Sequence, residues 1–195
     1  NTTGSENSAF GVYALLGNTT GGRNSAFGNQ AMASNTTGSY NSAFGYYALN
    51  SNQTGNFNSA FGYYSGIDIT TGFNNVTLGY NAGDNITTGD NNVFIGAGSK
   101  GLAATTGSIG IGFSASVTGN NQLVIGGTDA NGLIREGYFG SGVTNTSPAN
   151  FTLNATGGSG SNVAGASLIL AGGRSTGSGN GGNLLFAVSP AGTSG

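Results

Sequence analysis

Large apolar residues recur at a fixed interval through the first half of the chain. Each ends a triplet that opens with a small or β-branched residue, and each is followed by a glycine. The third triplet position is taken once every 17 residues by Phe10, Phe27, Phe44, Phe61, Leu78 and Ile95. Short runs of this kind bounded by Gly and Asn are typical of β-strands. The pattern predicts one three-residue strand per repeat, at 8–10, 25–27, 42–44, 59–61, 76–78 and 93–95.

The positions around each triplet keep the same 17-residue spacing without an insertion. A Thr-Gly pair opens each unit, an Asn precedes the triplet, and a Gly and then a small residue follow it. The Asn series is Asn7, Asn24, Asn41, Asn58, Asn75 and Asn92, and the Gly series is Gly11, Gly28, Gly45, Gly62, Gly79 and Gly96. We expect these glycines at corners where φ is positive and a Cβ would clash.

A unit of 17 residues is too short to bury its own core, so the units must stack. The fold class predicted is all-β, a β-solenoid whose coils lie about 4.8 Å apart with equivalent residues one above another. The Asn series then forms a side-chain ladder. We assign the Phe10 column to the coil interior and the Ala9 column to a smooth outer face, and the opposite assignment remains open.

Beyond Gly96 the period loosens, and the segments ending at Ile111 and Ile125 resemble degenerate coils. We therefore divide the chain into a repeat domain at 1–132 and a Gly/Ser-rich segment at 133–195. In the second part, strand-like runs at 151–155, 167–171 and 184–188 are separated by long Gly/Ser/Asn turns. These runs are too thin to form an independent core in one chain, which favours winding together of several copies.

Composition excludes most chemistry. The chain has 4 basic and 6 acidic residues, a net charge of −2, and neither Cys nor His. Thiol and imidazole catalysis, disulfides and the usual zinc ligands are thereby removed, and no basic stripe supports nucleic-acid binding. No apolar run approaches the roughly 18 residues of a membrane span. We predict that the protein is no enzyme, that it needs no cofactor or metal, and that it does not insert into membranes.

The frame Asn-Ser-Ala-Phe-Gly-x-x-Ala at 7–14 and its variant at 92–99 resemble the head repeats of trimeric autotransporter adhesins. The Thr-Thr-Gly-x-x-Asn opening and the runs at 162–173 and 181–186 resemble bacteriophage tail fibres still more closely. The resemblance implies a left-handed parallel β-roll in a homotrimer, followed by a trimeric β-prism-like segment. It also implies a place on the virion surface, contact with other virion or fibre proteins, and attachment to a host-surface glycan or protein receptor. A bacterial adhesin head and a purely structural extracellular filament remain the alternatives.

Three sets of residues are candidate sites. Tyrosines at equivalent positions, Tyr46, Tyr47, Tyr63 and Tyr64, with Tyr13 and Tyr80 beside them, predict either a glycan-binding patch or packing, between chains or against the corner of the roll. Asn-x-Ser/Thr sequons indicate glycosylation or simply abundant turn residues; they begin at Asn1, Asn18, Asn35, Asn52, Asn75, Asn85, Asn145, Asn150 and Asn154. Asp84 and Asp90 are best interpreted as solvated turn acids, since no Asp-x-Asp-x-Asp loop is present.

Overall fold

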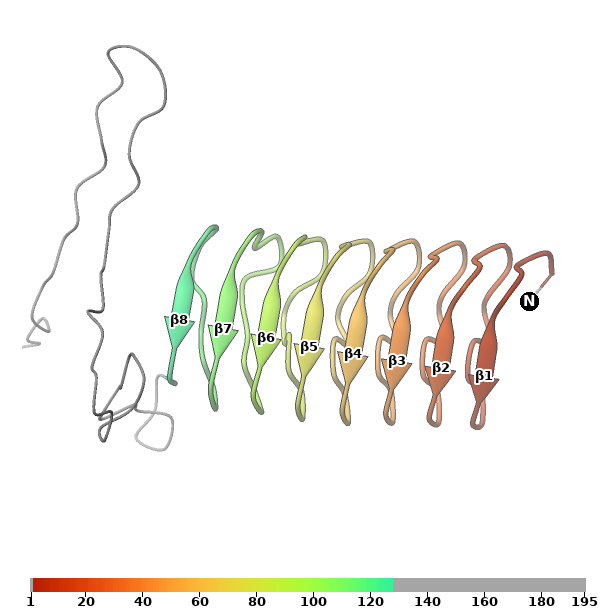
Figure 1. Ribbon diagram of the computed structural model, residues 1–195, viewed down its shortest axis with the longest axis horizontal. Helices are drawn as coiled ribbons and strands as arrows, with labels where there is room; N and C mark the ends of the chain where they lie inside the picture. Colours follow the sequence, from red (N-terminus) through yellow and green to blue (C-terminus); the bar gives the residue numbers. More distant parts are fainter. Residues whose placement is uncertain (1, 128–195) are drawn as a thin grey trace, which may run out of the picture. The chain divides into compact units, whose positions relative to one another are not determined.

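The computed structural model describes residues 2–127, which form a parallel β-solenoid without helices. Eight three-residue strands lie side by side in chain order in one sheet (Figure 1). They are β1 (Ser8–Phe10), β2 (Ser25–Phe27), β3 (Ser42–Phe44), β4 (Ser59–Phe61), β5 (Val76–Leu78), β6 (Val93–Ile95), β7 (Ile109–Ile111) and β8 (Leu123–Ile125). The predicted all-β class, the solenoid and the six regular strands are confirmed, and the degenerate coils continue the same sheet.

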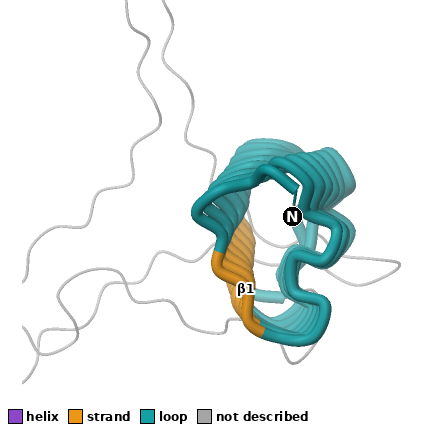
Figure 2. Tube along the Cα trace, turned by 90° about the vertical axis from the view of Figure 1, so that its right-hand side faces the viewer, coloured by secondary structure: helices purple, strands orange, loops and turns teal. Residues whose placement is uncertain are grey.

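Every strand pair is parallel and keeps the register of the repeat. Ala26 pairs with Ala43 and Ala43 with Ala60, so each strand residue pairs with its equivalent in the next coil. Figure 2, viewed along the stack, shows the strands superposed on one side and turns closing the rest of the coil. Backbone hydrogen bonds also join the turns of neighbouring coils, as from the Thr19 amide to the Thr36 carbonyl at 2.9 Å. Residues 128–195 lie outside the described part, and with them the predicted strands of the C-terminal segment.

The interior of the coil is narrow and is filled from two sides. The middle strand residues Ala26, Ala43 and Ala60 are fully buried, and Leu15, Met32 and Leu49 cover them from the opposite turn. The third strand residues point outward instead: Phe27, Phe44 and Phe61 are 39%, 37% and 41% exposed. The prediction that the column of Phe10, Phe27, Phe44, Phe61, Leu78 and Ile95 fills the coil interior is therefore wrong. The opposite assignment, with the column of phenylalanines outside the coil, is the one that the fold adopts.

Volume explains this orientation. The space opposite the strand is already taken by Leu15, Met32 and Leu49, so only a small side chain fits beneath it. Farther along the stack the turn residue becomes smaller and the strand residue larger. In the next two coils, the turn position of Leu49 is occupied by Gly66 and then by Gly83. The middle strand position enlarges to Thr77 and then to Phe94, both buried. A Cβ on Gly110 would lie 3.0 Å from the Phe94 ring, so glycine makes the room that Phe94 occupies.

Two columns of buried asparagines connect the coils. In the predicted series, the amide N–H of Asn75 donates to Asn58 Oδ1 at 3.0 Å, and the Asn58 Nδ2 donates to the corner carbonyl of Gly72 at 2.8 Å. A second column, which the sequence analysis missed, consists of Asn18, Asn35 and Asn52. It ends where Ile69 takes the next position, and Asn52 Oδ1 is left without a hydrogen-bond partner among the described residues.

Glycine is required at the corner after each regular strand. Gly45 has a φ of +145°, and a Cβ there would lie 2.2 Å from the Gly62 carbonyl oxygen of the next coil. Such contact is impossible, and the conformation is accessible essentially to glycine alone. The expected positive φ at the Gly11 to Gly96 series is confirmed, with values from +123° to +145°.

Candidate functional site: the outer aromatic face

The outer face of the sheet carries a continuous column of apolar side chains. Phe27 and Phe44 stack with ring centroids 4.9 Å apart, and Phe44 and Phe61 with centroids 5.0 Å apart, nearly parallel in both cases. Leu78, Ile111 and Ile125 continue the column, 47%, 37% and 50% exposed. The coil spacing places the rings at stacking distance, so their edges remain open to solvent.

The first strand position also points outward, and its character changes midway. It is serine in β1–β4, at Ser8, Ser25, Ser42 and Ser59, and it becomes Val76, Val93, Ile109 and Leu123 in β5–β8. The exposed face is thus a single aromatic strip bordered by hydroxyls in the first four strands. In the last four strands both outward positions are aliphatic. An apolar face running along all the strands is typical of an interaction surface.

The candidate tyrosines do gather beside this strip. Tyr46 stacks on Tyr63 with centroids 4.9 Å apart, and Tyr63 on Tyr80 with centroids 5.7 Å apart. Tyr47 and Tyr64 lie against the same rings, at 4.5 Å from Tyr46 and 4.3 Å from Tyr63. The hydrogen bond with Tyr64, together with partial burial and the neighbouring phenols, raises the pKa of Tyr63 to about 12.

This arrangement bears on what the patch binds. A sugar stacks on a free aromatic face, but Tyr63 is covered by Tyr46 on one side and by Tyr80 on the other, whereas the end ring Tyr80, 59% exposed, has a face that no other described ring covers. These contacts lie within one chain, so they favour packing of the four tyrosines against the roll over the glycan interpretation, and packing between chains stays a prediction. Glycan binding at Tyr46, Tyr47, Tyr63 and Tyr64 stays a prediction.

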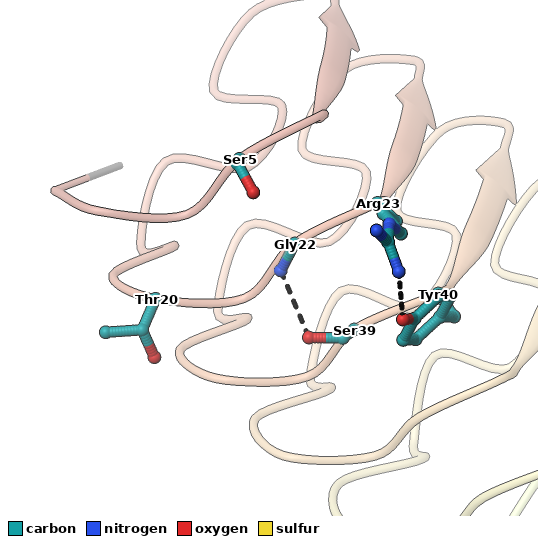
Figure 3. A pocket seen from close by; sticks show the side chains of 6 residues that line it. All are labelled: Ser5, Thr20, Gly22, Arg23, Ser39 and Tyr40. Atoms are coloured by element: carbon teal, nitrogen blue, oxygen red, sulfur yellow. Dashed lines mark hydrogen bonds between the residues drawn. The ribbon is translucent and has the colours of Figure 1, made fainter.

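A polar groove on the segments that lead into the first strands was missed by the sequence analysis (Figure 3). It has a volume of about 240 Å³ and is lined by Ser5, Thr20, Gly22, Arg23, Ser39 and Tyr40. Its floor is the position two residues before the ladder asparagine, which is Ser5, Gly22 and Ser39 in the first coils and Asn56, Phe73 and Asp90 in the later ones. A comparison of the repeats at each position could have revealed this groove, because small residues occupy its floor position in the first coils and not in the three coils that follow.

One wall of the groove is a stack of side chains from successive coils. Arg23 donates to Glu6 through Nε at 3.0 Å and to the Tyr40 hydroxyl through Nη1, and its guanidinium lies 5.2 Å from the Tyr40 ring centroid. Tyr40 stacks in turn on Phe57 at 4.8 Å. The hydrogen bond and charge of Arg23 lower the pKa of the Glu6 carboxyl below its usual value.

The remaining candidates are the sequon asparagines and the two acids, and their burial and contacts differ. Asn18, Asn35, Asn52 and Asn75 are at most 2% exposed and engaged in the ladders, which excludes glycan attachment at these sequons in the folded protein. Asn85 is exposed, whereas Asn1, Asn145, Asn150 and Asn154 lie outside the described residues. Asp84 accepts from the Asn85 side chain and Asp90 from the Phe73 amide. Within residues 2–127 no three acidic side chains gather as a metal site, and no helix long and apolar enough to cross a membrane occurs there.

Comparisons with known proteins gave no match: none among protein-family models, none among curated proteins and none among solved structures.

Proposed function

We propose that this chain is the structural and attachment segment of a homotrimeric fibre, most similar to a bacteriophage tail fibre, that contacts a host surface. The observation that carries the proposal is the outward apolar column of the sheet. Phe44 and its neighbours are held rigidly by coil stacking, yet nothing within the described chain covers their outer edges. Burying that strip against further copies would supply the hydrophobic stabilisation that the narrow interior supplies only in part.

The two halves of the face favour a parallel arrangement of copies. An antiparallel neighbour would place the serine row of Ser8 to Ser59 against the aliphatic row of Val76 to Leu123. A parallel neighbour matches serine with serine and aliphatic with aliphatic, and cyclic symmetry then closes the assembly. Three copies, a left-handed roll and a trimeric prism over 133–195 follow from the resemblance to fibre repeats.

The assembly is tested by sedimentation of the purified chain and of two aspartate variants. We expect three chains in the wild type and dissociation in Phe44→Asp, because the introduced carboxylate would be buried without a partner. Thr54→Asp is the matched control, since Thr54 is exposed and belongs to none of the strands. A monodisperse wild-type monomer would contradict the proposal.

Attachment is tested separately by binding of the labelled fibre segment to candidate bacterial host cells. We expect saturable binding that unlabelled protein displaces. A purely structural filament is the second candidate function, favoured by the mutual stacking of the tyrosine rings. Trimers that bind no cell of the susceptible host would support this filament and refute attachment. Shortening of host polysaccharide by the purified protein would refute the proposal that the chain is no enzyme.

A further inference from the structure

The groove over the first coils is lined in part by residues that the equivalent positions of the later coils do not keep. Its floor residues Ser5, Gly22 and Ser39 are small, while the same position in the next three coils carries Asn56, Phe73 and Asp90. The groove is consequently local, and its volume of about 240 Å³ is just below the range of typical small-molecule sites, which begins at about 300 Å³. It suits one ring-sized ligand at a time.

The groove presents hydrogen-bonding groups of both kinds. Thr20 and Ser5 contribute exposed hydroxyls on two sides (Figure 3), whereas the Ser39 hydroxyl accepts from the Gly22 amide at 3.0 Å and donates to the Thr37 carbonyl at 3.3 Å, which leaves it one acceptor lone pair for a ligand. Arg23 has five N–H donors, of which its contacts with Glu6 and Tyr40 use only part. Hydroxyls and a partly occupied guanidinium match the alternating donors and acceptors of a polyol.

The charges of the wall select against an acidic ligand. The positive charge of Arg23 is already compensated by Glu6, whose carboxylate lies 3.0 Å away. A second carboxylate entering the groove would compete with Glu6 and gain little, whereas an uncharged hydroxyl can use the free donors without displacing it. Both faces of the Tyr40 ring are occupied, by Arg23 and by Phe57, so recognition depends on hydrogen bonds and not on ring stacking.

We propose that the groove formed by Ser5, Thr20, Gly22, Arg23, Ser39 and Tyr40 binds one residue of a neutral saccharide. This inference rests on the proposed attachment function and assigns its ligand class and location. A shallow site of this kind binds a single sugar weakly. Repetition of the groove in each copy of an assembled fibre would raise the effective affinity for a surface that displays many sugars.

The test is saturation-transfer NMR on the full chain with the methyl glycosides of glucose, galactose and mannose. We expect transfer to at least one of them, a loss of at least tenfold in Gly22→Asn, and a weakening in Thr20→Ala. The repeat itself carries asparagine at the equivalent Asn56, so Gly22→Asn fills the groove with a residue that the fold accepts. Thr71→Ala is the matched control, because Thr71 is the counterpart of Thr20 in a coil without the groove.

Several outcomes would overturn the inference. They are no transfer to any of the three glycosides, unchanged transfer in a Gly22→Asn protein whose circular dichroism is native, and stronger transfer to the acidic sugar sialic acid than to all neutral ones. The proposed function fails in a different way, when wild-type protein is monomeric or binds no host cell. Trimers that adhere equally well with and without Gly22→Asn would refute the saccharide site and leave attachment intact.

Discussion

Replacing one buried ladder asparagine isolates the contribution of the polar interior. Asn58 is fully buried; its Nδ2 donates to the Gly72 carbonyl, and its Oδ1 accepts from both the backbone N–H and the side-chain Nδ2 of Asn75. Asn58→Leu keeps the size of the side chain and removes all three bonds, although the Asn75 Nδ2 keeps its bond to the Gly89 carbonyl. The Gly72 carbonyl and the Asn75 N–H would then be buried without a partner. A buried polar group left unpaired costs about 1–3 kcal/mol, which gives about 2–6 kcal/mol for the substitution.

The same change at Asn41 provides an internal comparison. Its Nδ2 donates to the Gly55 carbonyl, but this carbonyl also accepts from Asn52 of the second ladder at 3.1 Å. Asn41→Leu would therefore leave only the Asn58 N–H unpaired, since the carbonyl keeps a donor. We expect Asn41→Leu to be less destabilising than Asn58→Leu by about 1–3 kcal/mol, the value of one buried carbonyl.

The assay is urea unfolding followed by circular dichroism, at one protomer concentration because assembly and stability are linked. Hydrogen exchange of the Asn75 amide gives a local readout, and its protection should fall in Asn58→Leu. Asn29→Leu, at a partly exposed position, serves as the control and should shift the free energy by no more than about 0.5 kcal/mol. The reasoning is refuted when Asn58→Leu behaves like this control, or when Asn41→Leu is the more damaging of the two.

Three further predictions follow from the corner, the tyrosines and the face. Gly45→Ala places a Cβ 2.2 Å from the Gly62 carbonyl oxygen at a φ of +145°, and should destabilise the fold by about 3 kcal/mol or more in the same urea assay. The pKa of Tyr63 is raised to about 12, so its contribution to stability is complete below pH 10 and is lost as the pH rises from 10 to 12. The absorbance of tyrosinate measured against pH checks this shift. Titration of Tyr63 at the ordinary pKa of about 10 would contradict it. On the outer face, Ser42→Val should stabilise the proposed assembly and Val93→Ser should destabilise it, each by about 1–2 kcal/mol per chain. Sedimentation over a concentration series measures the change. Equal dissociation of the two variants would argue against this interface.

The sequence was sufficient for the solenoid but not for the direction of its side chains. An unbroken spacing of 17 residues fixes stacking and register, and glycine at Gly45 can only mark a corner. Which strand face is inside depends on the width of the coil, and that width is set by Leu49 across the coil. Leu49 has a φ of +50°, a conformation rare for leucine, so its inward direction does not follow from the apolar pattern. Asn52 was likewise taken for a turn residue, because its ladder is formed only when the coils are stacked.

The groove near Arg23 was missed for a different reason. Its signal is a difference between repeats, the small residue at Gly22 where later coils carry Asn56 and Phe73, whereas the predicted fold depends on what the repeats share. Residues that keep a solenoid together recur in every coil. A local binding site must depart from the repeat, so columns that vary while the frame is constant are the places to look for function.

The inside and the outside of the solenoid change at the same point along the stack. Between β4 and β5 the inner strand position grows from Ala60 to Thr77, the outer position changes from Ser59 to Val76, and the second asparagine ladder has just been replaced by Ile69. The first coils rely on two polar ladders and expose aromatic rings beside hydroxyls. The later coils bury more apolar volume and expose a wholly aliphatic strip. Since apolar burial is nondirectional while ladders fix register, the later coils are better suited to hold copies together in the proposed assembly, and the first coils to present the proposed groove with defined hydrogen-bonding geometry.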